Sequence, residues 1–209
     1  MVRVSGFNAG HSSFNFLTAR RDVFLHSFDI GSFKYSRPIA SYLQRKFPGR
    51  LSLTFGDSRN TVPRYFTRKR SSSPLTCDMI SVDGGHTSDV PLRDILNFAR
   101  VASLPHNVIL IDDYNEPAVR KAWSFALKSG IVRQHKLFNC RFARHRTKQF
   151  VVGKVVQRKP NWRPITDWKK SERKLKIICK TTKALRCRQK MHKRQWFIKV
   201  VKCKKNSRA

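Results

Sequence analysis

Short apolar, β-branched runs alternate with segments of helical periodicity along most of the chain, and this alternation restricts the possible folds most strongly. The strand-like runs are residues 23–28, 51–55, 79–82 and 108–111. The segments with apolar residues on one helical face are residues 37–47, 90–101 and 117–127. Strands that alternate with helices predict βαβ units and a mostly parallel sheet.

The pattern changes after Gly130. Residues 131–138 and 149–156 have strand character, with a basic turn at 141–147 and no helix between them. They predict an antiparallel hairpin at the edge of the sheet. The predicted fold is α/β and Rossmann-like: a doubly wound, mostly parallel sheet that ends in this hairpin and is followed by a basic tail.

The charge of the chain is extreme and uneven. Forty-five Lys and Arg against 12 acids give a formal net charge of +33. Residues 157–209 contain 20 of these basic residues and only two acids. This shift predicts a compact domain over residues 1–156 and a Lys/Arg-rich extension over 157–209, partly disordered. Such a charge attracts nucleic acid, anionic membranes or other polyanions.

Other features bear on where the protein works. No window approaches 18 consecutive apolar residues, so no transmembrane segment is predicted. The N-terminus lacks a secretory signal. Five scattered cysteines do not suggest a disulfide framework and favour an intracellular, cytoplasmic setting. Basic runs such as Lys202-Cys-Lys-Lys205 also resemble nuclear-targeting signals. Another basic run, Arg64, Arg68, Lys69 and Arg70, is predicted to be an exposed loop before residues 79–82.

Half of the ten acids in the first 156 residues follow directly, or within two residues, after a predicted strand. They are Asp29, Asp57, Asp83, Asp112 and Asp113. In a doubly wound sheet, ligands bind at the carboxyl ends of the strands, where these acids would gather. Helix capping is the alternative role for each of them.

The first strand–helix junction contains two glycines four residues apart, Gly6 and Gly10. Glycines permit a tight turn and a close approach of the backbone to a ligand, and Asn8 between them tolerates a positive φ. Asp29 follows 19 residues after Gly10, a spacing suited to a carboxylate that accepts hydrogen bonds from a ribose. This combination indicates a cofactor that contains a nucleoside.

These residues resemble the ordered motifs of class I S-adenosylmethionine-dependent methyltransferases, most closely the small metal-assisted O-methyltransferases of the catechol and macrocin type. The resemblance covers roughly residues 2–156. The motifs are Gly6-Phe-Asn-Ala-Gly10-His-Ser12, Ser27-Phe-Asp29, Phe55-Gly-Asp-Ser58, Val82-Asp-Gly-Gly-His86 and Ile111-Asp-Asp-Tyr114.

The resemblance implies a role for each matched residue. Gly6, Asn8 and Gly10 would line the methionine part of S-adenosylmethionine, Asp29 would bind the ribose, and Asp57 with Ser58 would lie near the adenine. Asp83, Asp112 and Asp113 would bind a divalent cation, usually magnesium, which orients and acidifies a substrate hydroxyl. His86 is the candidate general base, with a packing or capping role as the alternative.

The chain departs from the family pattern in three places. Val4 stands where an acid usually binds the amino group of the cofactor, and Gly85 stands where macrocin-type enzymes carry a further acid. The chain also begins inside the first predicted strand, which is compatible with a fragment, an abbreviated gene model or a degenerate enzyme.

Three functions remain open from the sequence. The first is metal-assisted O-methylation of a small hydroxylated substrate, in which Asp83 and His86 take part in catalysis. The second is binding or modification of nucleic acid on the same fold, because residues 157–209 interleave basic residues with Trp162, Trp168 and Trp196. The third is a methyltransferase-like protein without catalysis. A zinc site formed by Cys179, Cys187, His192 and Cys203 has no common ligand spacing.

Overall fold

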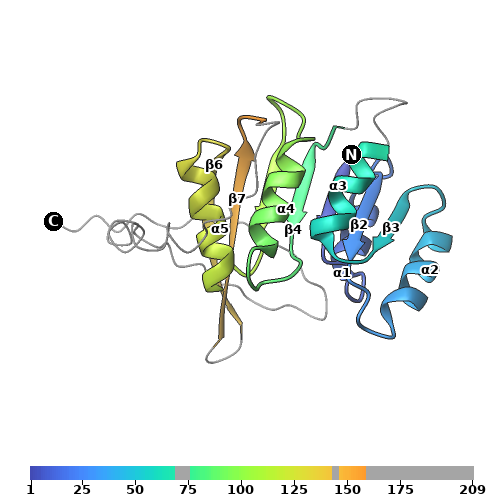
Figure 1. Ribbon diagram of the computed structural model, residues 1–209. Helices are drawn as coiled ribbons and strands as arrows, with labels where there is room; N and C mark the ends of the chain where they lie inside the picture. Colours follow the sequence, from blue (N-terminus) through green and yellow to red (C-terminus); the bar gives the residue numbers. More distant parts are fainter. Residues whose placement is uncertain (69–75, 143–145, 159–209) are drawn as a thin grey trace.

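The computed structural model describes residues 1–68, 76–142 and 146–158, which form one sheet with helices on both faces (Figure 1). The strands are β1 (Val2–Ser5), β2 (Leu25–Asp29), β3 (Leu51–Phe55), β4 (Met79–Val82), β5 (Val108–Ile111), β6 (Val132–Phe142) and β7 (Arg146–Val155). The helices are α1 (His11–Ala19), α2 (Ser36–Lys46), α3 (Ser58–Arg68), α4 (Val90–Ala99) and α5 (Pro117–Lys128).

The sheet has the strand order β3-β2-β1-β4-β5-β7-β6. Strands β1 to β5 are mutually parallel, whereas β7 runs antiparallel to both β5 and β6. The predicted doubly wound, Rossmann-like sheet with a terminal hairpin is therefore confirmed. The order reverses between β1 and β4, and at this point the crossovers on the two sides diverge and leave a crevice at the carboxyl ends of the strands.

Two hydrophobic clusters hold the helices on the sheet. The smaller one joins Val2 and Val4 of β1 to Leu17 of α1 and Leu43 of α2. The larger one joins β4 and β5 to helices α3, α4 and α5 and includes the fully buried Trp123. Because successive strand residues point to opposite faces, one strand can contribute to the packing on both sides.

Helix α3 corrects the prediction of an exposed loop around Arg64 and Arg68. The helix begins at Ser58 and extends to Arg68, with Pro63 inside it. Val62 is completely buried, and Tyr65 and Phe66 pack against the larger cluster. These three residues are spaced for one helical face, and their burial outweighs the helix-breaking effect of the proline. Lys69, Arg70 and the serines that follow lie outside the described residues.

The hairpin strands are longer than predicted. Strand β6 continues to Phe142, β7 begins at Arg146, and Arg141 pairs with Thr147 inside the segment predicted as a turn. A run of basic residues does not end backbone pairing in a ladder, because strand side chains alternate between its two faces and can stay in water.

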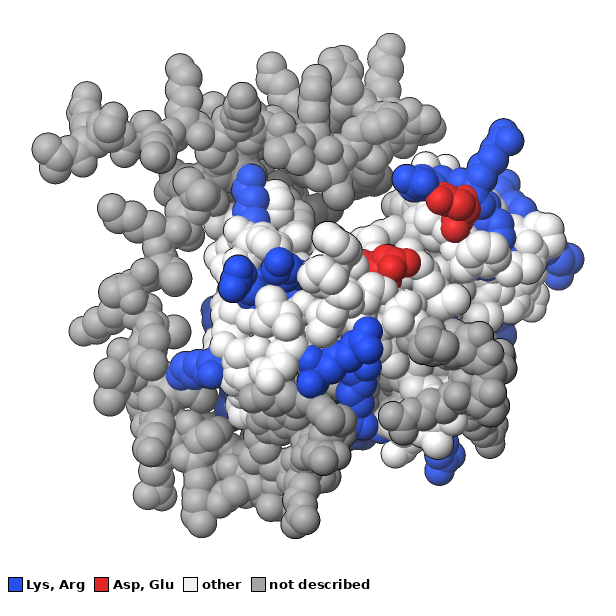
Figure 2. Space-filling model, turned by 90° about the horizontal axis from the view of Figure 1, so that it is seen from above, with Lys and Arg blue, Asp and Glu red and all other residues white. Residues whose placement is uncertain are grey.

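The basic extension beyond residue 158 lies outside the described residues, and so do its candidate nuclear-targeting run and its Cys/His group. No helix in the described part of the chain is long and apolar enough to cross a membrane. Figure 2, a view from above relative to Figure 1, shows Lys and Arg in several groups on the described surface, and Asp and Glu in two small ones.

Candidate functional site

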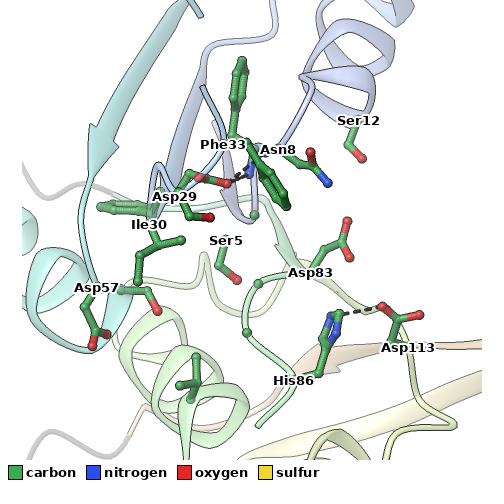
Figure 3. Close-up of a pocket in the computed structure, with 18 of the residues that line it drawn as sticks. Ser5, Asn8, Ser12, Asp29, Ile30, Phe33, Asp57, Asp83, His86 and Asp113 are labelled. Atoms are coloured by element: carbon green, nitrogen blue, oxygen red, sulfur yellow. Dashed lines mark hydrogen bonds and ion pairs between the residues drawn. The ribbon is translucent and has the colours of Figure 1, made fainter. Parts of the chain in front are cut away.

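A pocket of about 660 Å³ opens at the carboxyl ends of the parallel strands. Its lining comes from the loops after β1, β2, β3, β4 and β5, together with one residue of β7. Asp83, His86 and Asp113 lie together at one side of the pocket, and Asp57 and Ile30 lie at the other (Figure 3).

The glycine loop between β1 and α1 has the backbone that the sequence predicts. Gly6, Asn8 and Gly10 all have positive φ, at 89°, 48° and 72°. Gly6 also lies very close to the loop after β4, since a Cβ at Gly6 would be 2.0 Å from the carbonyl oxygen of Asp83. A side chain at Gly6 would therefore push apart the two loops that form the centre of the pocket.

Asp29, at the end of β2, connects the first two loops. Its Oδ2 accepts hydrogen bonds from the backbone N–H groups of Phe7 (2.8 Å) and Asn8 (2.9 Å), and its Oδ1 accepts one from Gly31 (2.7 Å). Asn8 is held a second time, because the Tyr35 hydroxyl donates to its Oδ1 at 2.6 Å. Asp29 thus fixes the glycine loop while its carboxylate faces the pocket.

Asp83, His86 and Asp113 form the cluster that could hold a metal ion. Each offers one ligand atom, and these atoms lie within 4.8 Å of one another. Nε2 of His86 is 3.0 Å from Oδ2 of Asp113. His86 lies four residues before the start of α4, and the N-cap position of that helix is Asp89. His86 therefore does not cap α4.

Asp112, the third predicted metal ligand, interacts with Asp83 but is not one of the three converging ligand residues. Its Oδ1 accepts the backbone N–H of Asp113 at 2.8 Å, and its Oδ2 is 2.8 Å from Nζ of Lys148. Lys148 Nζ also lies 3.5 Å from Oδ1 of Asp113. Asp112 does not line the pocket, whereas Lys148 does.

The electrostatics of this group follow from its partial burial. Burial, and then the charge of Asp112, raise the pKa of Asp83 to about 7, while Lys148 acts in the opposite direction. Burial alone would lower the pKa of Lys148, but its hydrogen bond to Asp112 and the three nearby carboxylates raise it. Lys148 therefore remains an ammonium ion at neutral pH.

Two of the predicted cofactor residues, Asp57 and Gly10, have structural roles. Asp57 is bound by Arg59, whose side-chain hydrogen bonds hold the pKa of that carboxyl below its usual range. Its Oδ1 also accepts the backbone N–H of Arg59, the capping role that was the alternative for these acids. Gly10 does not line the pocket: it precedes α1, and a Cβ there would be 2.7 Å from the side chain of Leu43. Ser58 does line it.

Sequence reasoning missed Lys148 and the apolar residues after β2. Ile30 and Phe33 are 67% and 50% exposed and line the pocket. In Figure 3, Ile30 lies on the side away from His86 and Asp113. The position of Ile30 and Phe33 directly after Asp29 could have identified them. Nothing in the sequence marks Lys148, because it reaches the pocket from the last strand of the hairpin.

Comparison with known proteins agrees with this geometry. Residues 4–114 match a family model described as a methyltransferase domain, while a search of curated proteins found no match. The O-methyltransferase TomG of Streptomyces achromogenes, solved with S-adenosylmethionine, is 17% identical, with a TM-score of 0.61 over 75% of this chain and 73% of TomG. An rRNA methylase of Streptococcus thermophilus is 14% identical, with a TM-score of 0.52 over 75% of this chain and 87% of the methylase.

The cofactor-bound protein Rv0187 from MTB gives a third comparison, with 16% identity and a TM-score of 0.58 over 74% of this chain and 72% of that one. At such identities these structures share the fold with this chain. The family match is the stronger finding, since it spans more than half of the chain and includes the glycine loop, Asp29, Asp83 and Asp113. The chain therefore belongs to the methyltransferase domain family.

Proposed function

We propose that the protein transfers a methyl group to a hydroxyl oxygen of a small molecule with the help of a divalent cation. One observation carries this proposal: the glycine loop with Asp29 and the Asp83–His86–Asp113 cluster line the same pocket. A methyl donor bound at the first group and a hydroxyl bound at the second would meet inside it. Such positioning lowers the barrier of a displacement reaction substantially.

In this proposal the β1–α1 loop and Asp29 bind S-adenosylmethionine, which supplies an electrophilic methyl group. Gly6 and Asn8 present backbone close to the ligand, and the Asp29 carboxylate accepts hydrogen bonds from the ribose hydroxyls. Ile30 and Phe33 give an apolar surface beside the adenine, and Asp57 and Ser58 line the same pocket. The buried Val4 leaves the amino group of the cofactor to other acceptors.

The donor set at the other side fits a divalent cation. Asp83 and Asp113 offer the carboxylate oxygens that hard cations such as magnesium prefer, and Asp112 directly precedes Asp113 at the same strand end. We assign Asp83, Asp112 and Asp113 as the residues that would hold it. When bound, a cation there lowers the pKa of a substrate hydroxyl and orients it.

His86 is placed to receive the proton of that hydroxyl. Its ring lines the pocket, and Oδ2 of Asp113 lies 3.0 Å from Nε2 and orients the imidazole. We assign His86 as the general base. Asp83 borders the same space and would both hold the cation and fix the substrate oxygen.

A nucleic-acid substrate on the same fold is the second candidate. It is favoured by the net charge of +33 and by the structural likeness to an rRNA methylase. In that case the acceptor would be a nucleotide, guided by the basic residues outside the acidic pocket. Competition between RNA and small hydroxylated molecules in a methyl-transfer assay separates the two substrate classes.

Calorimetric titration of S-adenosylmethionine, with and without magnesium, tests the cofactor site. We expect micromolar binding that is lost in Asp29→Ala, because the variant removes the ribose acceptor and releases the hydrogen bonds to Phe7 and Asn8. Asp22→Ala serves as the control, since this exposed acid pairs with Arg20 away from the pocket. No binding by the wild-type chain would contradict the proposal and favour a protein without catalysis.

Methyl transfer itself tests the metal role. Turnover of a small hydroxylated acceptor should require added magnesium or manganese and should fall by orders of magnitude when Asp83, Asp112 and Asp113 are all changed to Asn. Methylation that persists in this triple variant, which keeps the size of each side chain, would refute metal assistance while leaving the cofactor site intact.

A further inference from the structure

Lys148 is a basic side chain that contacts two of the predicted metal ligands, Asp112 and Asp113. Its ammonium nitrogen lies 2.8 Å from Asp112 Oδ2 and 3.5 Å from Asp113 Oδ1. The sheet fixes this approach, because β7 pairs antiparallel with β5, Ile111 opposite Val151, and the N–H of Tyr114 donates to the carbonyl of Gln149. Lys148 is thus brought beside the two aspartates that follow β5.

With Lys148 in this place, both carboxylate oxygens of Asp112 already have a partner. One of its oxygens accepts the backbone N–H of Asp113 and the other contacts the ammonium group. The potential ligand atoms that converge belong to Asp83, His86 and Asp113, and Asp112 is not among them. In a three-aspartate site, a cation and the Lys148 ammonium group would compete for Asp112 and Asp113.

We propose that the Lys148 ammonium group occupies part of the cation site, and that a divalent cation must displace it from Asp112 and Asp113 to bind. This inference rests on the proposed metal-assisted function and names the residue that regulates metal affinity. A positive charge a few ångströms from a divalent cation repels it strongly in a partly buried site. The ammonium group and the divalent cation therefore compete for the same carboxylates.

The lysine is suited to such an exchange. Its side chain is 41% exposed, so the ammonium group can turn toward water without opening the core. A lysine has a flexible four-carbon stem and binds as a point charge, unlike the rigid planar fork of an arginine. In the absence of metal it keeps the neighbouring carboxylates from repelling one another.

Manganese binding, measured by electron paramagnetic resonance of the full-length chain, tests the proposal without any need for turnover. We expect Lys148→Met to bind Mn²⁺ about tenfold more tightly than wild type, because the competing charge is gone. Lys154→Met is the matched control: it removes the same charge from the same strand, about 20 Å farther along, and should bind as wild type does.

A double-mutant cycle tests whether Lys148 and the metal ion compete for Asp112. Asp112→Asn should weaken Mn²⁺ binding several-fold more in the Lys148→Met background than in the wild-type background, where Asp112 is held by the lysine. An equal effect in both backgrounds, or equal affinities of wild type and Lys148→Met, would overturn the inference while leaving metal assistance in place. No Mn²⁺ binding by any variant would overturn both, and the calorimetric test of the cofactor site would still stand.

Discussion

At the scale of single residues, Asp94 is the most unusual group outside the pocket. It projects from α4 toward Ser5 and Gly84, is completely buried, and neither carboxylate oxygen has a hydrogen-bond partner of good geometry among the described residues. Burial raises its pKa to about 6, although the nearby Ser58 and Ser5 hydroxyls act in the opposite direction. The charged form is therefore costly in the folded state.

Asp94→Asn should stabilise the protein at neutral pH. The folded pKa of about 6 lies above the ordinary value of 3.8, so the folded state binds the proton more tightly. The contribution of the protonated Asp94 carboxyl to wild-type stability is complete below pH 4 and is lost as the pH rises through 6. The gap of about two pKa units corresponds to about 3 kcal/mol.

Urea unfolding of both proteins between pH 4 and pH 8 measures this difference. The advantage of Asp94→Asn in unfolding free energy should grow over this interval and then level off. Asp22→Asn, a change at an exposed acid that is bound to Arg20, should show no such growing advantage. A constant difference between Asp94→Asn and wild type would mean that the carboxyl is not destabilised by its burial.

The residues of the site were predictable where they depend on one strand end. Asp29 ends β2, and Asp83 and Asp113 come just after β4 and β5; the carboxyl ends of these parallel strands must meet at one edge of the sheet. The partnership of Asp112 with Lys148 was not predictable, because it depends on the register of β7 against β5. A shift of one residue would turn Lys148 to the other face.

At the scale of elements, the alternating pattern was sufficient to predict the parallel strands and most helices, but not α3. The basic run from Arg64 to Arg70 led to the prediction of a loop, although Val62, Tyr65 and Phe66 are spaced for one helical face. The helix forms because these apolar side chains are buried against the larger cluster, and such burial is a property of the assembled fold. The length of the hairpin was likewise set by backbone pairing that local composition does not determine.

Packing between α5 and the hairpin makes Gly153 a sensitive position. A Cβ there would lie 2.5 Å from the carbonyl oxygen of Arg133 and 2.9 Å from the ring of Trp123. We expect Gly153→Ala to lower the unfolding free energy by about 1–3 kcal/mol through crowding in the core. Chemical denaturation followed by Trp fluorescence measures the loss.

Gly130→Ala provides a contrasting control for this prediction. Gly130 has a φ of 66° and open space around it, so its substitution strains the backbone without a clash and should cost about 1 kcal/mol. If Gly153→Ala were as stable as wild type, β6 and α5 could separate at no cost, and the close packing of Trp123 against β7 would not contribute to stability.

At the scale of the whole molecule, the charges are separated by position. The pocket gathers four acids, Asp29, Asp57, Asp83 and Asp113, against two basic residues, Arg59 and Lys148, each of which pairs with an acid. Elsewhere on the described surface Lys and Arg form several groups, as Figure 2 shows for one face. Residues 159–209 add 19 basic residues and two acids. A polyanion would therefore be drawn to the extension and the outer surface rather than into the pocket.

This separation predicts that RNA and cofactor bind independently. The full chain should bind a single-stranded RNA with an affinity that falls steeply between 50 and 200 mM salt, as expected where many phosphates are neutralised. A chain ending at Arg158, whose guanidinium donates to the carbonyl of Ala102, keeps every described strand and helix. It should lose most of the RNA affinity and of the salt dependence, yet bind S-adenosylmethionine as the full chain does.

Fluorescence anisotropy with labelled RNA at several salt concentrations, beside calorimetry with the cofactor, measures both affinities. A shortened chain that binds RNA as tightly as the full one would place the RNA interface on the folded domain. Mutual weakening of RNA and cofactor binding would instead bring the RNA into the pocket, since two ligands that bind independently do not alter each other's affinity. That result would favour a nucleotide over a small hydroxylated molecule as the methyl acceptor.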